Sequence, residues 1–324
     1  MFWIQLSLAR VKAICCVTLA LILFLSYPYQ ALAQSKGFWE NLWEQVSSIG
    51  KKRTKLEAPR GRTKALAGRG RCPALLPIDI YELPLTAFVP ALSNLQTKEQ
   101  SSQKISSYQN VWSTTAAEYP TFWFYIPYSY NDSGVKYAKF ALLDRDNHLV
   151  FDPILIEFPK DEKVSENKPS IAQFTLPNQI KGGLKIGNEY KWYFSIICDA
   201  RKPSKNPSVS GWIQRVKSPF PIEPSKAALT QNGYQYYVKT YAKAGIWHET
   251  LTLVANNKEQ QIQFPQENWV SLIQYIFQDE IQNTKKKTLE EQSTNYHQIA
   301  NQIANSPMIK LVPAQNQEEL ENEL

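Results

Sequence analysis

The chain carries few residues whose types and spacing could do chemistry. Its three histidines, His148, His248 and His297, share no metal-ligating spacing with one another or with the four cysteines. No G-x-S-x-G motif, phosphate-binding loop or dinucleotide-binding fingerprint occurs in the sequence. We therefore predict no catalytic residue, no cofactor and no metal site, and we expect that the protein is not an enzyme.

Four acidic residues leave one enzymatic alternative open. A pair of carboxylates could hydrolyse a glycosidic bond, and Glu118, Asp144, Asp199 and Glu249 could supply such a pair. Each of them is more simply interpreted as a surface or turn residue. The segment 144–147, Asp-Arg-Asp-Asn, could also ligate calcium, but it lacks the length and the downstream glutamate of a calcium-binding loop. It therefore predicts a hairpin turn.

The N-terminus has the pattern of a secretory signal peptide. Arg10 and Lys12 precede an apolar run at 14–25, and Ala-Leu-Ala at 31–33 is a cleavage site of the A-x-A type. We predict that residues 1–33 are removed and that the protein is secreted to the periplasm or the extracellular space. An uncleaved anchor is the alternative, although the apolar run is shorter than the roughly 20 residues that span a membrane.

Cleavage would leave two of the four cysteines in the exported chain. Cys15 and Cys16 lie within the predicted signal peptide, so Cys72 and Cys198 remain. Two cysteines in an oxidising compartment most simply pair. We predict a disulfide bond between Cys72 and Cys198, and two buried thiols are the alternative.

The strongest strand signal lies at residues 190–199. Tyr190, Trp192, Phe194 and Ile196 alternate with more polar residues, as in a strand with one face on a core. Similar patterns at 83–89, 119–128, 137–143, 149–158, 171–176 and 209–216 bring the total to about seven strands. We predict a mainly β protein with helices, in which residues 72–218 form an immunoglobulin-like β-sandwich. The polar residues 92–112 predict a long loop or a disordered insertion.

Large rings on both faces of one predicted strand raise the question of what covers them. Phe122 and Phe124 point to one face, and Trp123 and Tyr125 point to the other. Exposed rings on a sheet could bind carbohydrate, so Trp123, Tyr125 and Tyr193 are candidate binding aromatics. The interpretation that we favour is cover, so we predict that the C-terminal helices pack on Trp123 and Tyr125.

Prolines at 219, 221 and 224 mark a change in composition. Residues 227–244 and 246–255 have helical spacing on either side of Gly245, and 269–277 and 283–306 predict further helical segments. We assign residues 219–324 to a helical region with a polar tail.

The mature N-terminus combines an apolar stripe with basic residues. Residues 34–71 predict an amphipathic helix, with Trp39 and Trp43 on its apolar side, followed by a basic linker. The chain has a net charge of +7. Trp39 and Trp43 are candidate residues of a membrane foot on an anionic surface, although we favour the docked helix described next. The alternative is a helix docked on its own domain, and export disfavours a nucleic-acid partner.

Four segments resemble a known family. They are 70–72 (Gly-Arg-Cys), 119–128 (Tyr-Pro-Thr-Phe-Trp-Phe-Tyr-Ile-Pro-Tyr), 192–198 (Trp-Tyr-Phe-Ser-Ile-Ile-Cys) and 211–216 (Gly-Trp-Ile-Gln-Arg-Val). They are similar to the cyanobacterial family called domain of unknown function 928, over roughly residues 60–256. The resemblance implies an exported protein but no established activity and no catalytic residues. The tail after about residue 256 departs from the family pattern.

Together these patterns favour a non-enzymatic interaction module of the cell envelope, whose partner is a protein or another envelope component. A carbohydrate-binding module is the first alternative and would need a row of exposed rings on a sheet face. A hydrolase is the second alternative and would need a cleft with two facing carboxylates.

The membrane foot leads to a testable prediction. The mature protein, residues 34–324, should sediment with anionic vesicles at low salt and be released at high salt, because salt screens attraction worth at most about 1 kcal/mol per basic residue. The double change Trp39→Ala, Trp43→Ala should weaken sedimentation although it leaves the charge intact. A mature protein that stays in the supernatant at low salt would rule out the foot.

Overall fold

The computed structural model describes residues 60–61, 83–89, 91–92, 109–128, 137–159, 169–179, 183–199, 201–221, 231–260, 266–277 and 298–317. The predicted signal peptide, Trp39, Trp43 and Cys72 lie outside these residues. The mainly β fold with a few helices is confirmed. No helix within the described part of the chain is both long enough and apolar enough to cross a membrane.

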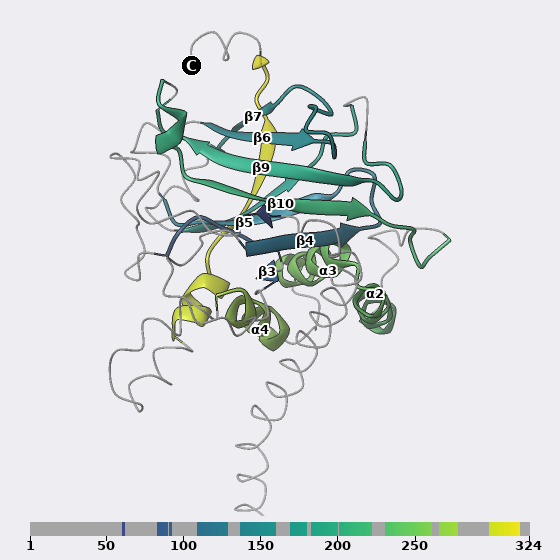
Figure 1. Ribbon diagram of the computed structural model, residues 1–324. Helices are drawn as coiled ribbons and strands as arrows, with labels where there is room; N and C mark the ends of the chain where they lie inside the picture. Colours follow the sequence, from purple (N-terminus) through teal and green to yellow (C-terminus); the bar gives the residue numbers. More distant parts are fainter. Residues whose placement is uncertain are drawn as a thin grey trace, which may run out of the picture.

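One curled sheet forms the body of the molecule (Figure 1). Its strands follow the order β1-β4-β10-β9-β6-β7-β11-β8-β5-β2, and β3 pairs with β4 beside this path. The bounds are β1 Arg60–Gly61, β2 Thr86–Ala87, β3 Ala91–Leu92, β4 Gln109–Thr115, β5 Thr121–Ile126, β6 Tyr137–Leu143, β7 Ile154–Glu157, β8 Ser170–Thr175, β9 Glu189–Ile197, β10 Ser208–Arg215 and β11 Met308–Pro313. A short 3-10 helix, η1, spans Pro203–Lys205.

The inner face of the curl holds the main core, and β9 lies at its centre. Residues 190, 192, 194 and 196 alternate inward as predicted and are buried. The curl brings β5 over β9, so that Phe124 stacks on Phe194 with ring centroids 3.9 Å apart. Phe140 on β6 and Phe174 on β8 also meet across the inner face, with tilted rings whose centroids lie 5.0 Å apart. Aromatic contacts across the inner face therefore hold the two halves of the sheet together.

The immunoglobulin-like sandwich is not confirmed, and β11 is the physical reason. This strand lies antiparallel to β7, through Val312↔Glu157, and parallel to β8, through Met308↔Ile171. Without it, the strands from β4 to β7 and the strands β8, β5 and β2 would form two separate sheets. The sequence analysis placed this segment in a helical region with a polar tail, whereas its Ile309 and Leu311 are buried in the inner core.

The curl leaves a seam where β4 and β5 approach each other without pairing. The segment 86–92 crosses this seam, because β2 pairs with β5 and β3 pairs with β4. The prediction of a loop or disordered insertion over residues 92–112 was wrong at both ends, since it included Leu92 of β3 and the first residues of β4. The sequence of β4, Gln-Asn-Val-Trp-Ser-Thr-Thr, is mostly polar, so it did not indicate a strand.

The helices α2 Gln231–Lys243, α3 Trp247–Gln260 and α4 Gln266–Ile276 lie on the outer side of the seam (Figure 1). The helical residues 298–304 join the same outer core. Gly245 joins the first two with a φ of 68°, which a residue without a side chain adopts at little cost. The indole of Trp123 donates a hydrogen bond to Thr252 Oγ1 on α3 at 3.1 Å, and Tyr125 meets Phe277 edge to face. The predicted cover of Trp123 and Tyr125 by the C-terminal helices is confirmed.

The contact between β9 and β10 permits a sharp test. Gly211 pairs with Trp192, and a Cβ atom at Gly211 would lie 2.7 Å from the indole and 2.6 Å from a methyl group of Val111. Gly211→Ala should therefore lower the free energy of unfolding by about 1–3 kcal/mol in urea denaturation. Ser210→Ala, one residue away on the opposite face, is the control and should change it by less than about 0.5 kcal/mol. Equal effects of the two substitutions would contradict this close approach.

Candidate functional site

The polar residues that the fold brings together lie at the seam. We define the seam cluster as Ser113 and Thr115 on β4, Thr121 on β5, and His248 and Glu249 in the first turn of α3. The three consecutive hydroxyl residues of β4, at positions 113–115, are each at most 1% exposed. All three hydroxyls have hydrogen-bonding partners in α3 or in the turn before it, and Thr114 donates to the Gly245 carbonyl. The buried hydroxyl groups of β4 are therefore satisfied by α3 and by the turn before it.

His248 bridges β4 and β5, which do not pair with each other. Its Nδ1 lies 3.0 Å from the carbonyl oxygen of Thr121, and its Nε2 lies 2.9 Å from the hydroxyl of Ser113. A carbonyl can only accept, so we assign the proton to Nδ1. In the neutral imidazole Nε2 is then the acceptor, and Ser113 donates to it. This proton is consequently not available to the carbonyl of Trp212, 3.1 Å from the same hydroxyl.

Burial keeps the imidazole neutral. A protonated ring could donate to Ser113, which would turn its own proton to the Trp212 carbonyl, so hydrogen bonding alone does not disfavour the charge. The ring is 2% exposed and packs edge to face on Phe122 at 5.1 Å. This desolvation lowers the pKa of His248 to about 4, against the weaker opposing effect of the Thr121 carbonyl. The cost of burying a charge therefore outweighs the gain in hydrogen bonds.

Glu249 is pushed toward its neutral form as well. Its Oε1 accepts hydrogen bonds from Thr115 Oγ1 at 2.6 Å and from the Ala117 amide at 3.0 Å. Its Oε2 is buried without a hydrogen-bond partner. Desolvation by burial raises the pKa of Glu249 even though the hydrogen bonds from Thr115 and the backbone lower it. Two neighbouring titratable residues of α3 thus share a preference for losing their charge.

The Ser113–His248 pair has the spacing of a nucleophile and its general base, but not the access. The Thr121 carbonyl occupies the position of a group that orients the base. Ser113 has no exposed surface, so a substrate carbonyl has no path to its Oγ. A base with its pKa lowered to about 4 is also weak at neutral pH. The geometry therefore favours a structural role, which links β4, β5 and α3.

A second contact joins α3 to the segment that crosses the seam. The indole nitrogen of Trp247 donates to the carbonyl oxygen of Phe88 at 2.9 Å, and the Phe88 amide donates to the Trp123 carbonyl at 2.9 Å. Trp247 and Phe88 are fully buried. The first turn of α3 therefore contacts every segment that meets at the seam.

The other acidic candidates have local partners. Glu118, in the β4–β5 connection, pairs with Arg215 at 3.2 Å and is about half exposed. Asp199 accepts hydrogen bonds from the amides of Arg201 and Lys202, so it stabilises the turn after β9. The structure therefore gives each of these carboxylates a turn or surface role, as the sequence analysis favoured.

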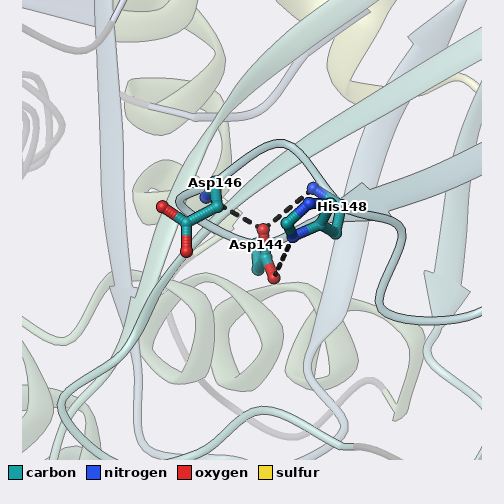
Figure 2. Close-up of side chains that lie close together, drawn as sticks. All are labelled: Asp144, Asp146 and His148. Carbon is teal, nitrogen blue, oxygen red and sulfur yellow. Dashed lines mark hydrogen bonds and ion pairs between the residues drawn. The ribbon is translucent and has the colours of Figure 1, made fainter.

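The turn after β6 brings together two carboxylates and an imidazole, whereas the sequence analysis had considered only residues 144–147 as ligands (Figure 2). Ligand atoms of Asp144, Asp146 and His148 lie within 4.8 Å of one another. However, Asp144 Oδ1 accepts the amides of Asp146 and His148, both at 2.9 Å, and Oδ2 lies 3.6 Å from the His148 ring. These amide hydrogen bonds lower the pKa of Asp144. The predicted turn is confirmed, and its own hydrogen bonds account for the arrangement.

The remaining candidates lie apart from the seam cluster. Trp123 and Tyr125 are buried, whereas Tyr193 is half-buried and has the Lys191 ammonium 5.0 Å from its ring centroid. Cys198 directly follows β9, and its amide donates to Asn206 Oδ1 at 2.9 Å. The disulfide stays a prediction because Cys72 lies outside the described residues.

Comparison with protein families identifies the chain. The model of the Domain of Unknown Function DUF928 matches residues 68–289. The chain belongs to the DUF928 family. The comparison found no matching curated protein, and no solved structure matches the chain either.

The DUF928 match contains the whole seam cluster and the helices α2, α3 and α4. It continues to residue 289, so the expectation that the chain departs from the family pattern after about residue 256 was wrong for residues 257–289. It ends before β11, so the strand that joins the two parts of the sheet lies outside it. The sequence analysis missed the cluster, because it assigned Ser113 and Thr115 to no strand and placed His248 in a helix without a special role. A signal was nevertheless present in the three consecutive hydroxyl residues that precede the predicted strand at 119–128.

The buried imidazole predicts how stability depends on pH. The unfolded chain binds a proton at the usual pKa of 6.5 and the folded chain only at about 4, so stability should fall as pH drops from about 6.5 to about 4. The loss attributable to His248 is of order 3 kcal/mol. His248→Gln should make the decline shallower when the free energy of unfolding is measured across this range. His148→Gln, on the exposed turn, is the control, and its free energy of unfolding should depend on pH as steeply as that of the wild type. An unchanged slope in His248→Gln would contradict the burial of a neutral ring.

Proposed function

We propose that this DUF928 protein is an exported, non-enzymatic interaction module of the cell envelope that binds another protein. The observation that carries the proposal is an aromatic cluster on α2 and on the chain that follows β10. Phe220 lies at its centre, with ring centroids of Tyr237 at 4.5 Å, Tyr241 at 5.0 Å and Tyr236 at 5.9 Å. The ring of Tyr236 is 61% exposed.

The composition of this aromatic cluster suits a protein partner. Tyrosine and phenylalanine are enriched at protein interfaces because their rings supply apolar area at little conformational cost. The rings meet edge to face, which holds the exposed Tyr236 beside Phe220 in one arrangement. Lys217 and Lys239 are exposed close by in the sequence, which favours a partner with some acidic residues.

The carbohydrate-binding alternative has less support. Flat sugar rings bind to rings that share a plane, and the candidate aromatics Trp123 and Tyr125 are buried under α3 and α4. Tyr193 offers a single half-buried ring. The hydrolase alternative has less support as well, because the Ser113 hydroxyl is sealed from solvent and Glu118 is paired with Arg215.

The proposed location rests on the N-terminal sequence. The basic residues, apolar run and cleavage motif support export to the periplasm or the extracellular space, and the amphipathic segment with Trp39 and Trp43 supports association with a membrane surface. The family resemblance supports a cyanobacterial source. Cell fractionation and the N-terminal sequence of the mature protein test the location: Gln34 should be the first residue, and an intact leader in a cytoplasmic fraction would refute export.

Site-specific photo-crosslinking in cells tests the interaction role. A photoreactive amino acid in place of Tyr236 should give a covalent adduct with an envelope protein. The same amino acid in place of Leu149 or Ile186 is the control, since both side chains are about half exposed and lie outside the cluster. The substitution Phe220→Ala should abolish the adduct because it removes the centre of the cluster. Equal labelling at all three positions would contradict a binding surface on α2.

A further inference from the structure

The strand β11 occupies a groove between two strands that belong to the family-matched region. β7 and β8 both lie within residues 68–289, whereas β11 lies beyond them. Their backbone edges do not pair with each other; each pairs with β11 instead. In Figure 1 the yellow C-terminal strand rises from the helical side toward β7. The DUF928 region thus presents a strand-shaped groove, which a peptide from outside that region fills.

The groove recognises its strand through two side chains and the main chain. Ile309 and Leu311 enter the inner core and are 3% and 2% exposed, respectively. The intervening Lys310 points outward and is exposed, and Val312 is 50% exposed. Four residue pairs align β11 with β8, and the Ile171 amide donates to the Pro307 carbonyl at 2.9 Å. This is the pattern of strand addition, in which backbone hydrogen bonds give affinity and alternate side chains give specificity.

A glutamine closes the C-terminal end of the groove. Gln317 Oε1 accepts the Leu155 amide of β7 at 2.7 Å. Its Nε2 donates to the Leu155 carbonyl at 2.8 Å and to the Ala314 carbonyl at 2.9 Å. The side-chain amide therefore imitates a further backbone pair on β7. The segment 307–317 carries its own recognition elements, which are an Ile-x-Leu pair and a terminal clamp.

We propose that the groove between β7 and β8 is an exchangeable strand-binding site, and that its ligand in trans is the segment 307–317 of a second copy of this chain. A second copy fits because it supplies the same pairs, the same two buried side chains and the same clamp. Exchange therefore loses no contact, and the balance between the two arrangements depends on concentration and on chain connectivity. This site is separate from the aromatic cluster on α2, so each proposal can fail without the other.

Disulfide trapping between full-length chains tests the exchange. Lys310 of β11 pairs with Gln173 of β8, and neither side chain is buried. Two variants, Lys310→Cys and Gln173→Cys, are unfolded together, refolded at increasing concentration and oxidised. The expected result is a covalent dimer, whose crosslinked peptides join positions 173 and 310 by mass spectrometry and whose yield rises with concentration. Lys239→Cys on α2 replaces Lys310→Cys in the control and should give no such product.

A crosslink only within a single chain that carries both substitutions would overturn the proposal, because the strand would then be held in cis at every concentration. A second measurement uses the full-length double variant Ile309→Asp, Leu311→Asp, whose own strand cannot enter the core. A fluorescent peptide of residues 306–317 should bind this variant, with rising anisotropy, at least ten-fold more tightly than a peptide carrying the same two changes. Equal binding of the two peptides would also overturn the proposal.

Discussion

A curled sheet must satisfy the polar groups where its approaching strands do not pair, and this constraint shapes the present structure. Ser113, Thr114 and Thr115 are buried at the seam, and an unpaired buried polar group costs about 1–3 kcal/mol. The first turn of α3 and the turn before it supply partners to all of them. The helix therefore sits against the seam for polar as well as apolar reasons, because Trp123 and Tyr125 also need cover.

Burial disfavours charge on the titratable groups of the seam cluster. His248 and Glu249 would each be costly to bury in charged form, and desolvation moves the pKa of each toward the uncharged state. A neutral imidazole with its proton on Nδ1 has the directionality needed to connect two strands, since it donates to the Thr121 carbonyl and accepts from Ser113. The same feature that resembles catalytic machinery thus explains how the curl closes.

The sequence predicted the parts of the fold that depend on local alternation. The inward residues of β9 and the two faces of β5 followed from period-two patterns of large rings. The role of β11 in joining β7 to β8 could not be predicted. This strand is short and lies far from both partners in the sequence, so local patterns do not show which strands it pairs with. The seam cluster was not predicted for a similar reason. The hydroxyl residues of β4 have no period-two apolar pattern, and their partners around the start of α3 are far away in the sequence.

The most direct test of this account is the protonation state of His248 in the folded protein. Long-range ¹H–¹⁵N NMR spectra of the imidazole should show a neutral ring, with the proton on Nδ1, from neutral pH down to about pH 5. The exposed His148 supplies a second set of imidazole signals in the same sample for comparison. A protonated His248 at pH 6, or a proton on Nε2 in the neutral ring, would contradict the claim that a buried neutral histidine links β4 to β5.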